Sequence, residues 1–288
     1  MSQTLRGRIA VVTGGSRGVG KGAALGLGEA GATVYVTGRT AQQGSIASTG
    51  TITETAEAIT RLGGRGIAVR CDHGDDADVE ALFRRVKEEE GRLDVLVNNV
   101  FATYSGVRPA GAPFWELPLA MWDELHRVGL RSHYVASVFA APIMIAQRHG
   151  LIANISSVGA ARYTFNVPYG VGKAAVDRLT ADMAHELRPH GVAVVSLWPG
   201  LVKTERVMAQ PDRLPPELIA RLTDAESPQF TGRAVAALAA DPKIIEKTGN
   251  VYVVAELAEA YGFTDVDGRR PPLSPGIAAL RASRERST

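Results

Sequence analysis

The chain has 288 residues, a length within the range of one large α/β domain, so length gives no reason to divide it. Its 32 basic and 30 acidic side chains give a formal net charge of +2, which excludes the positive excess typical of nonspecific nucleic-acid binding, and we expect no nucleic-acid partner. The single cysteine excludes an internal disulfide, and the first residues lack the apolar stretch of a secretory signal, so we expect a cytoplasmic protein. The apolar stretches are shorter than the ~20 residues of a membrane span or are interrupted, and no transmembrane helix is expected.

Short β-branched runs alternate with longer amphipathic segments along the chain. Seven such runs occur, at residues 8–13, 33–37, 66–71, 93–98, 151–156, 192–197 and 250–254. They are typical of buried parallel strands, and the segment after the third run carries Val79, Leu82, Phe83 and Val86 at helical spacing. Because crossovers between parallel strands are right-handed, the series predicts a single Rossmann-type, doubly wound α/β domain. Its mainly parallel seven-stranded sheet has helices on both faces.

We place this domain at residues 1–268. The remaining residues, 269–288, are rich in proline and arginine, a composition that favours a flexible tail over an arm on a partner subunit.

The first strand leads directly into the sequence TGGSRGVG at residues 13–20, which is followed by a helical stretch. Glycines let a backbone turn tightly and approach a pyrophosphate, whose charge the N–H groups at the helix N-terminus stabilise. Gly14, Gly18 and Gly20 are the candidates for these roles, with a tight turn that holds no ligand as the alternative. The sequence GLGEAG at residues 26–31 also matches G-x-G-x-x-G but follows no strand, so we expect it to bring a helix close to the sheet.

The second strand ends in Thr37, Gly38 and Arg39, where an NAD enzyme would carry an acidic residue for the ribose 2′-hydroxyl. The guanidinium of Arg39 suits a 2′-phosphate instead, and Arg17 in the glycine turn can supply a second positive charge. The sequence therefore favours NADP(H) over NAD(H). The alternative is that both arginines are ordinary surface charges.

The six histidines show no close pairing with cysteine or carboxylates at metal-ligand spacing. We expect surface or packing roles for them, and no metal site. Cys71 ends the third run and is expected to be a buried small hydrophobic residue.

Tyr169 and Lys173 lie four residues apart on a helix whose first turn Pro168 predicts. A tyrosine hydroxyl, with a pKa of about 10, is a poor acid–base catalyst near neutrality unless a cation stabilises its phenolate, and Lys173 can supply that cation. Such a pair alone is common as a surface contact. Ser156 and Ser157 add hydroxyl groups at the end of the fifth strand, on the edge of the sheet where ligands bind in open α/β folds.

Together these motifs resemble the short-chain dehydrogenase/reductase family over roughly residues 5–255. The likeness rests on TGGSRGVG, the Asn98-Asn99 pair, the serine pair, YGVGK at 169–173, and Pro199-Gly200 with Thr204. Further stretches, among them VGLRSHY and YGFTDVDGR, are similar to the animal dehydrogenase/reductase member-one branch and extend the likeness to about Arg269. The resemblance implies an NADPH-dependent carbonyl or steroid reductase.

The resemblance also implies residue roles. Tyr169 would donate the proton, Lys173 would lower its pKa and hold the nicotinamide ribose, and Ser157 would orient the carbonyl. Ser156 is the rival because it has the commoner thirteen-residue spacing to Tyr169. Asp72 and Asn99 would line the adenine side, and Thr204 would contact the carboxamide. The expected cofactor-binding residues are Gly14, Ser16, Arg17, Gly18, Val19, Gly20, Arg39, Asp72, Asn99, Tyr169, Lys173, Pro199, Gly200, Val202 and Thr204.

Two positions depart from the family pattern. Gly129 stands where the family commonly has an asparagine that kinks the helix and helps to hold a proton-relay water, which puts the relay in doubt. Val100 and Phe101 replace the usual small residues after the asparagine pair and are expected to narrow the site.

The leading hypothesis is an oxidoreductase that transfers a hydride between NADP(H) and a carbonyl or hydroxyl group of a hydrophobic ketone, aldehyde or steroid-like molecule. The largely apolar segments 101–114 and 205–228 favour such substrates. The alternatives are an NAD(P)+-dependent alcohol dehydrogenase and a non-catalytic dinucleotide-binding sensor. The likeness further implies a homodimer or homotetramer formed through the helices at 130–145 and 169–187.

Overall fold

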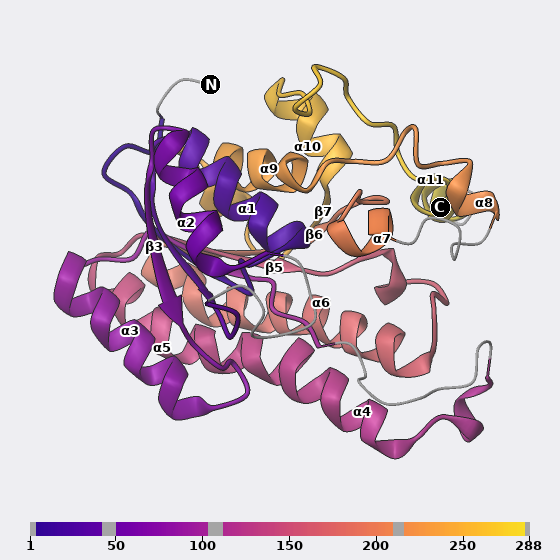
Figure 1. Cartoon of the computed structure of the whole chain (residues 1–288), viewed down its shortest axis with the longest axis horizontal. Helices are drawn as coiled ribbons and strands as arrows, with labels where there is room; N and C mark the ends of the chain where they lie inside the picture. Colours follow the sequence, from indigo (N-terminus) through magenta and orange to yellow (C-terminus); the bar gives the residue numbers. More distant parts are fainter. Residues whose placement is uncertain (1–3, 42–49, 103–111, 210–215, 286–288) are drawn as a thin grey trace.

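The computed structural model describes residues 4–41, 50–102, 112–209 and 216–285. Seven parallel strands form one sheet in the order β3-β2-β1-β4-β5-β6-β7 (Figure 1). The strands are β1 (Ile9–Thr13), β2 (Thr33–Gly38), β3 (Arg65–Arg70), β4 (Val95–Asn98), β5 (Gly150–Ile155), β6 (Val192–Trp198) and β7 (Val251–Val253). Each predicted run overlaps one of them, and the predicted doubly wound α/β fold is confirmed.

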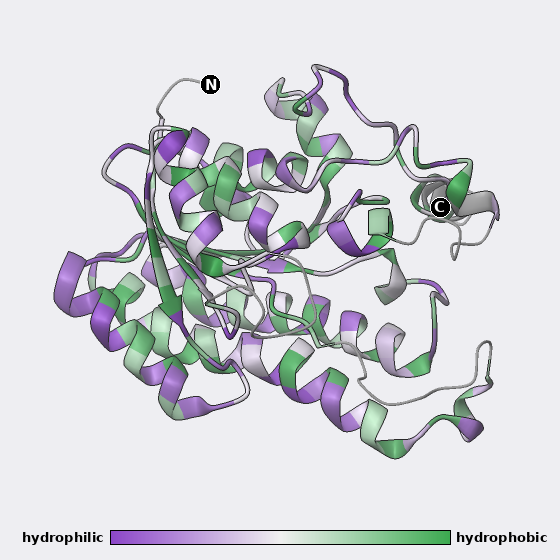
Figure 2. Cartoon of the chain, viewed as in Figure 1, coloured by the Kyte–Doolittle hydropathy of each residue, from purple (hydrophilic) through white to green (hydrophobic). Residues whose placement is uncertain are grey.

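Helices cover both faces of the sheet, and each face has its own hydrophobic cluster. One face carries α1 (Gly18–Glu29), α2 (Ile52–Arg61), α9 (Pro228–Ala240) and α10 (Val254–Tyr261). The other carries α3 (Asp76–Glu90), α5 (Ser132–Ala146) and α6 (Val167–Leu187). The strands are coloured predominantly hydrophobic in Figure 2 while the outer helices are mixed, which is the pattern of amphipathic helices over a buried sheet.

Shorter elements connect these layers. A π-helical turn, η2 (Arg127–Arg131), joins α4 (Leu119–His126) to α5. The other short helices are α7 (Glu205–Ala209), α8 (Pro216–Ile219), η1 (Phe114–Glu116), η3 (Val158–Ala160), η4 (Arg188–His190) and η6 (Ile244–Lys247), and the described chain ends in α11 (Pro275–Glu285).

Local sequence explains where these helices begin and end. Thr51 and Glu54 form a reciprocal capping box at the start of α2. Asp75 caps α3, and Gly91 ends it with a φ of 68°, a conformation that favours glycine. The four apolar residues predicted to share one face of α3 are all buried in the second cluster.

The second glycine-rich sequence begins in the last turn of α1 and ends just after it, and its glycines allow helices to approach closely. A Cβ atom built on Gly26 would overlap the backbone of Gly232 in α9, and one on Gly28 would lie 2.8 Å from Ile59 in α2. We expected these small residues to pack α1 against the sheet. That expectation is wrong, because Gly26 and Gly28 face the neighbouring helices α9 and α2 instead.

The segment after Gly268 differs from the flexible tail that its composition favours. Ile277 in α11 is 1% exposed and packs with Trp198, Val253 and Ala255, while Leu280 lies against the same cluster. Two apolar residues three positions apart share one face of a helix, and burying that face on the domain outweighs the polar composition around it.

One continuous helical stretch, Leu119–Ala146, is long and apolar enough to cross a membrane by length and composition. Half of its most apolar window is buried inside the protein, where α5 contributes to the second cluster. A buried core helix passes the same test, so this stretch is weak evidence for a membrane span.

Candidate active site

The glycine turn after β1 has two positions that a residue with a side chain would fit poorly. Gly14 has a φ of 70°, and a Cβ atom on Gly20 would overlap the Gly14 carbonyl oxygen and the amide of Asn99. Both positions therefore need glycine, and the backbone they permit leaves the N-terminus of α1 at the carboxyl edge of the sheet. Val19 packs against the core below this turn, and Ser16 is 7% exposed and accepts a hydrogen bond from Arg17 Nε at 3.2 Å.

Asn99 holds this turn rather than pointing away from it. Its Nδ2 donates to the carbonyl oxygens of Thr13 and Gly14 at 3.0 and 3.1 Å. Asn98, one residue earlier, donates instead to Ser137 and Asn154 and so ties α5 to β5. The asparagine pair thus connects the end of β4 to the glycine turn on one side and to α5 and β5 on the other.

An anionic side chain already occupies the N-terminus of α1. The Glu205 carboxylate accepts a hydrogen bond from the Gly18 N–H at 2.7 Å and lies 3.8 Å from Lys21 Nζ. Thr204, expected at the carboxamide, lies beside Gly18 as well, with its Cγ2 3.5 Å from an ideal Cβ there. A carboxylate bound by this N–H shows that the helix end accepts an anion. Sequence reasoning missed Glu205, although its position next to Thr204 was available as a signal.

The two arginines of the predicted 2′-phosphate site lie around the end of β2. Arg17 donates to Thr40 Oγ1 at 3.0 Å, one residue after Arg39, whose guanidinium is 3.9 Å from the Asp72 carboxylate. Burial lowers the pKa of Arg17, Glu205 opposes this shift, and repulsion from Arg39 adds to it. Two guanidinium groups close enough to repel each other favour an anion between them.

The turn after β6 is fixed by a buried acid. Gly200, which follows Pro199, donates its N–H to Glu226 Oε1 at 2.8 Å, and Val202 pairs with Glu226 in a parallel bridge. Burial raises the pKa of Glu226 to about 8, well above the ordinary value of a carboxyl group. Sequence reasoning did not single out Glu226, because nothing in its neighbours marks it as buried.

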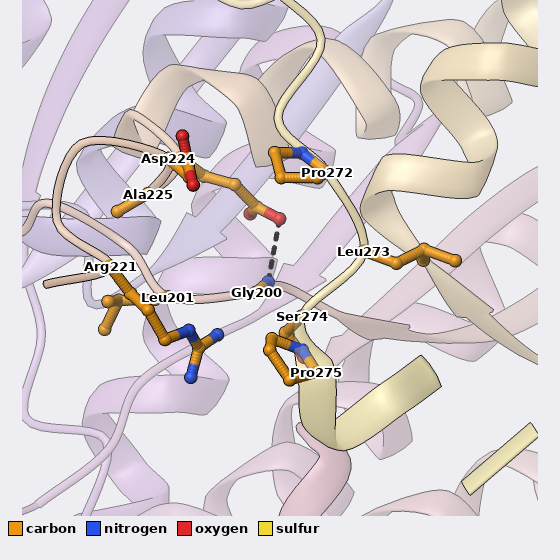
Figure 3. Close-up of a pocket in the computed structure, with 10 residues that line it drawn as sticks. Gly200, Leu201, Arg221, Asp224, Ala225, Pro272, Leu273, Ser274 and Pro275 are labelled. Atoms are coloured by element: carbon orange, nitrogen blue, oxygen red, sulfur yellow. Dashed lines mark hydrogen bonds between the residues drawn. The ribbon is translucent and has the colours of Figure 1, made fainter. Parts of the chain in front are cut away.

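A cavity of about 140 Å³ lies beside this turn (Figure 3). Its lining comes from three parts of the chain, namely Gly200 and Leu201, residues 221–226, and Pro272 to Pro275. The chain segment before α11 therefore forms part of the wall at the carboxyl edge of the sheet.

Ser157, Tyr169 and Lys173 come together at the same edge. The Tyr169 hydroxyl donates to Ser157 Oγ at 2.9 Å, and Lys173 Nζ donates to the Ile155 carbonyl oxygen at 2.9 Å. Ser156 instead donates to the Lys173 carbonyl oxygen at 3.1 Å and faces the core. The geometry brings Ser157, and not Ser156, to Tyr169.

The start of α6 sets the position of this tyrosine. Asn166 caps the helix by accepting a hydrogen bond from the Tyr169 N–H at 2.9 Å, and Pro168 occupies the first turn as predicted. Phe165, just before the cap, has a φ of 63° and places its ring 5.1 Å from that of Tyr169. Phe165 and Asn166 were not predicted, although an asparagine before a helical proline is a capping signal.

Burial shifts both titratable groups of this cluster. It raises the pKa of Tyr169, and the hydrogen bond with Ser157 opposes that shift. It also lowers the pKa of Lys173 to about 8, and the nearby Asp177 carboxylate opposes that shift. Asp177 is held in turn by Ser196 and Trp198 at 2.6 and 3.0 Å. The tyrosine is therefore a neutral acid beside a weakly held proton on lysine.

The histidine and cysteine side chains near the third strand have packing roles. His73 is buried and lies 2.7 Å from the Thr37 hydroxyl, while Cys71 is a buried free cysteine as expected. Within residues 4–41, 50–102, 112–209 and 216–285, no group of three or more His, Cys, Asp or Glu side chains could hold a metal ion. Residues 103–111 and 210–215, within the segments expected on the substrate side, lie outside the described residues.

Among solved structures, a putative short-chain alcohol dehydrogenase from Sinorhizobium meliloti 1021 is similar, with a TM-score of 0.74 and 28% identity, over 88% of this chain and 97% of that chain. A 7α-hydroxysteroid dehydrogenase complexed with NADH and 7-oxo glycochenodeoxycholic acid has a TM-score of 0.73 and 26% identity, over 88% of this chain and 94% of that one.

Sequence comparison gives a closer likeness. Dehydrogenase/reductase SDR family member 1 of Mus musculus and that of Homo sapiens are 47% and 46% identical over 278 residues, which cover 93% of this chain and 86% of each relative. The family model for short chain dehydrogenases matches residues 8–214. The chain therefore belongs to the short-chain dehydrogenase/reductase family of oxidoreductases.

Proposed function

We propose that this protein is an NADP(H)-preferring reductase of hydrophobic carbonyl compounds, in which Tyr169 donates the proton. The observation that carries the proposal is the cluster at the carboxyl edge of the sheet. There the Tyr169 hydroxyl is 2.9 Å from Ser157 Oγ, with the buried Lys173 one helical turn further along. This arrangement joins an acid, a hydroxyl to orient a carbonyl and a cation in one site.

The roles of the three side chains follow from their chemistry. A bound nicotinamide dinucleotide would supply the hydride chemistry, and the side chains of this site would handle the proton. The Tyr169 hydroxyl, which donates to Ser157 Oγ in the structure, would turn to the substrate and transfer its proton to the carbonyl oxygen. The Ser157 hydroxyl would donate its own hydrogen bond to the same oxygen. Lys173 stabilises the phenolate that remains, and the reverse sequence oxidises an alcohol.

The glycine turn and the N-terminus of α1 would hold the pyrophosphate of the dinucleotide, which would take the place of the Glu205 carboxylate at the Gly18 N–H. The backbone positions of Gly14 and Gly20 exclude side chains there, and the Gly18 N–H binds a carboxylate. Arg17 and Arg39 would hold the 2′-phosphate between them, which supports NADP(H) as the preferred cofactor. Lys173 would hold the nicotinamide ribose.

The surroundings of Tyr169 favour an apolar substrate. The rings of Phe101 and Phe165 flank it at 5.9 and 5.1 Å, and they are 39% and 67% exposed. Exposed rings beside an acid suit a ketone, an aldehyde or a steroid-like molecule. The steroid ligand named for the 7α-hydroxysteroid dehydrogenase structure supports the last of these classes.

We also propose that the protein forms a homodimer or homotetramer through α5 and α6. These neighbouring helices expose Tyr134, Val138 and Val171 at 54%, 46% and 44%. Sedimentation should show a dimer or tetramer, and Val138→Asp should shift it toward monomer because a charge would be buried at the interface. A wild-type protein that sediments only as a monomer would contradict this part of the proposal.

The first experiment titrates the purified protein with NADPH and NADH by fluorescence, and then follows oxidation of the preferred cofactor with a panel of hydrophobic carbonyl compounds. Arg39→Ala should weaken NADPH binding about tenfold, the low end for a hydrogen bond to a charged group, while NADH binding stays unchanged. Preference for NADH in the wild type would contradict the role of Arg39. NADPH binding without turnover would favour the sensor, and turnover restricted to alcohols with NAD(P)+ would favour the dehydrogenase.

A further inference from the structure

Two unusual positions of the sequence meet in space beside Lys173. Gly129 is buried in the π-helical turn η2, and Phe101 follows β4. A Cβ atom built on Gly129 would lie 2.7 Å from Cδ2 and 3.0 Å from Cε2 of the Phe101 ring. Real Cβ atoms essentially never come that close, so the ring occupies the space that a side chain at position 129 would need.

The same ring contacts the pair of residues that carry the proposed chemistry. It meets Tyr169 edge to face, with centroids 5.9 Å apart and an interplanar angle of 84°. Lys173 Nζ lies 5.1 Å from the Phe101 centroid, closer than the 6.0 Å to the Tyr169 centroid. Phe101 therefore touches both the acid and the cation as well as the backbone turn at Gly129.

We propose that Phe101 is a positioning residue for the Tyr169–Lys173 pair, and that its ring takes the place of a side chain at position 129, so that the two positions act as one coupled unit. The role at Tyr169 and Lys173 rests on the proposed function, whereas the coupling to Gly129 does not. The ring keeps water away from the Lys173 ammonium on this side, while its face offers the ammonium a cation–π contact.

The other sides of the Lys173 side chain are also buried by protein atoms. Its side chain is 8% exposed and bonded to the Ile155 carbonyl oxygen. The titratable groups that face it are Asp177 and Tyr169 on its own helix and His133 on α5. Because His133 is itself buried and its pKa is lowered to about 3, that residue is neutral. The protonation of Lys173 would thus depend on how closely the Phe101 ring covers its ammonium group.

The coupling between Phe101 and Gly129 is tested first by thermal unfolding, without any activity measurement. Alanine is ordinarily more stable than glycine within a helix, so Gly129→Ala would normally raise the melting temperature. We expect it to fall by several degrees, because the added methyl group meets the ring. In a Phe101→Ala background the same change should no longer lower it. A Gly129→Ala protein as stable as the wild type, or an equal loss in both backgrounds, would overturn the coupling.

The positioning role is tested by the pH profile of kcat/KM for carbonyl reduction. Activity should fall as the pH rises through the Lys173 pKa of about 8, because the neutral amine no longer stabilises a phenolate. Phe101→Ala removes the cation–π contact but lets water reach the ammonium. Because desolvation is the larger cause of the lowered Lys173 pKa, that pKa should rise toward the ordinary value, and the alkaline midpoint should move up by roughly half a pH unit or more. Phe101→Tyr keeps the ring and should restore the wild-type midpoint.

Phe165→Ala is the matched control, because it also removes a ring against Tyr169 but its only described ring contact is with Tyr169. It should lower activity without moving the alkaline midpoint. An unshifted midpoint in Phe101→Ala, or the same shift in Phe165→Ala, would overturn the positioning role. If the wild type reduces no carbonyl, the proposed function and the positioning role fail together, while the melting experiment still decides the coupling.

Discussion

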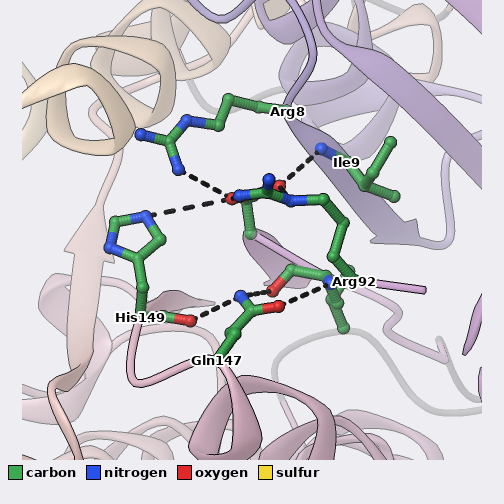
Figure 4. Close-up of polar contacts among 7 residues, drawn as sticks. Arg8, Ile9, Arg92, Gln147 and His149 are labelled. Atoms are coloured by element: carbon green, nitrogen blue, oxygen red, sulfur yellow. Dashed lines mark hydrogen bonds and ion pairs between the residues drawn. The ribbon is translucent and has the colours of Figure 1, made fainter. Parts of the chain in front are cut away.

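At the amino end of the sheet Asp94 is 2% exposed and accepts hydrogen bonds from Arg8, Arg92 and the Ile9 N–H, all at 2.5–2.9 Å (Figure 4). At the carboxyl end the buried Lys173 ammonium has a carbonyl oxygen and two aromatic rings around it, and the Asp177 carboxylate favours its charged form without a salt bridge to it among the described residues. Both ends bury charge, but only the amino end surrounds it with charged partners.

The pKa values reflect this difference. Burial by itself raises the pKa of Asp94, but the hydrogen bonds from Arg92, Ile9 and Arg8 outweigh it, and the net pKa is lowered. At Lys173 burial prevails and its pKa moves toward neutrality. A charge stabilised as at Asp94 strengthens the fold but is inert, whereas a charge held as at Lys173 can respond to chemistry beside it.

Tyr169→Phe should have the largest effect, and only on activity. Removing the hydroxyl removes the proposed proton donor, so kcat should fall by about 10²–10⁴-fold, the usual contribution of general acid catalysis. Tyr163→Phe, at a tyrosine 74% exposed six residues earlier, is the control and should retain activity. Steady-state kinetics of both variants measure this difference in kcat. An equal fall of kcat in the two variants would contradict the role of Tyr169 as the proton donor.

Ser157→Ala should have the next largest effect. It removes the hydroxyl that orients the carbonyl oxygen, and the loss of one such donor typically lowers kcat by about 10²–10³-fold. Ser156→Ala is matched to it one residue away, but that hydroxyl is bonded to the Lys173 backbone, so the change should mainly lower the melting temperature. The reverse result, with Ser156→Ala the slower enzyme, would contradict the geometry.

Asp94→Asn tests the opposite end of the sheet and should affect stability. The variant replaces charge-assisted hydrogen bonds by weaker neutral ones, which should lower the free energy of unfolding by roughly 1.5–3 kcal/mol. Its kcat should match the wild type, because Asp94 lies at the far end of the sheet. Urea unfolding and steady-state kinetics measure the two quantities separately.

Lowering the pH should reduce the stabilising contribution of Asp94 gradually, with a smaller effect than the substitution. The folded pKa of Asp94 lies below its ordinary value of 3.8, so its contribution to stability is present above that value and is lost as the pH falls through the folded pKa. Unfolding measured at successively lower pH should therefore show a steeper acid loss in the wild type than in Asp94→Asn. Parallel curves would mean that Asp94 does not titrate on unfolding.

The sequence by itself determined the elements that depend on local patterns. The seven strands follow from runs of β-branched residues, and the start of α6 follows from Pro168. The four-residue spacing places Tyr169 and Lys173 on one face, and the glycine turn after β1 leads directly into α1. Each of these depends on residues close together in the chain, so period and turn chemistry suffice.

The tertiary structure decided everything that depends on contacts between distant segments. Ser157 was chosen over Ser156 by the direction in which β5 ends relative to α6, and Glu205 reached Gly18 across 187 positions of the chain. The placement of α11 on the domain depended on an apolar cluster assembled from β6, β7 and α10. In the sequence, Phe101 and Gly129 are two separate departures from the family pattern. Only the folded structure shows that the Phe101 ring fills the space that a side chain at position 129 would need, because close packing is a property of the folded interior.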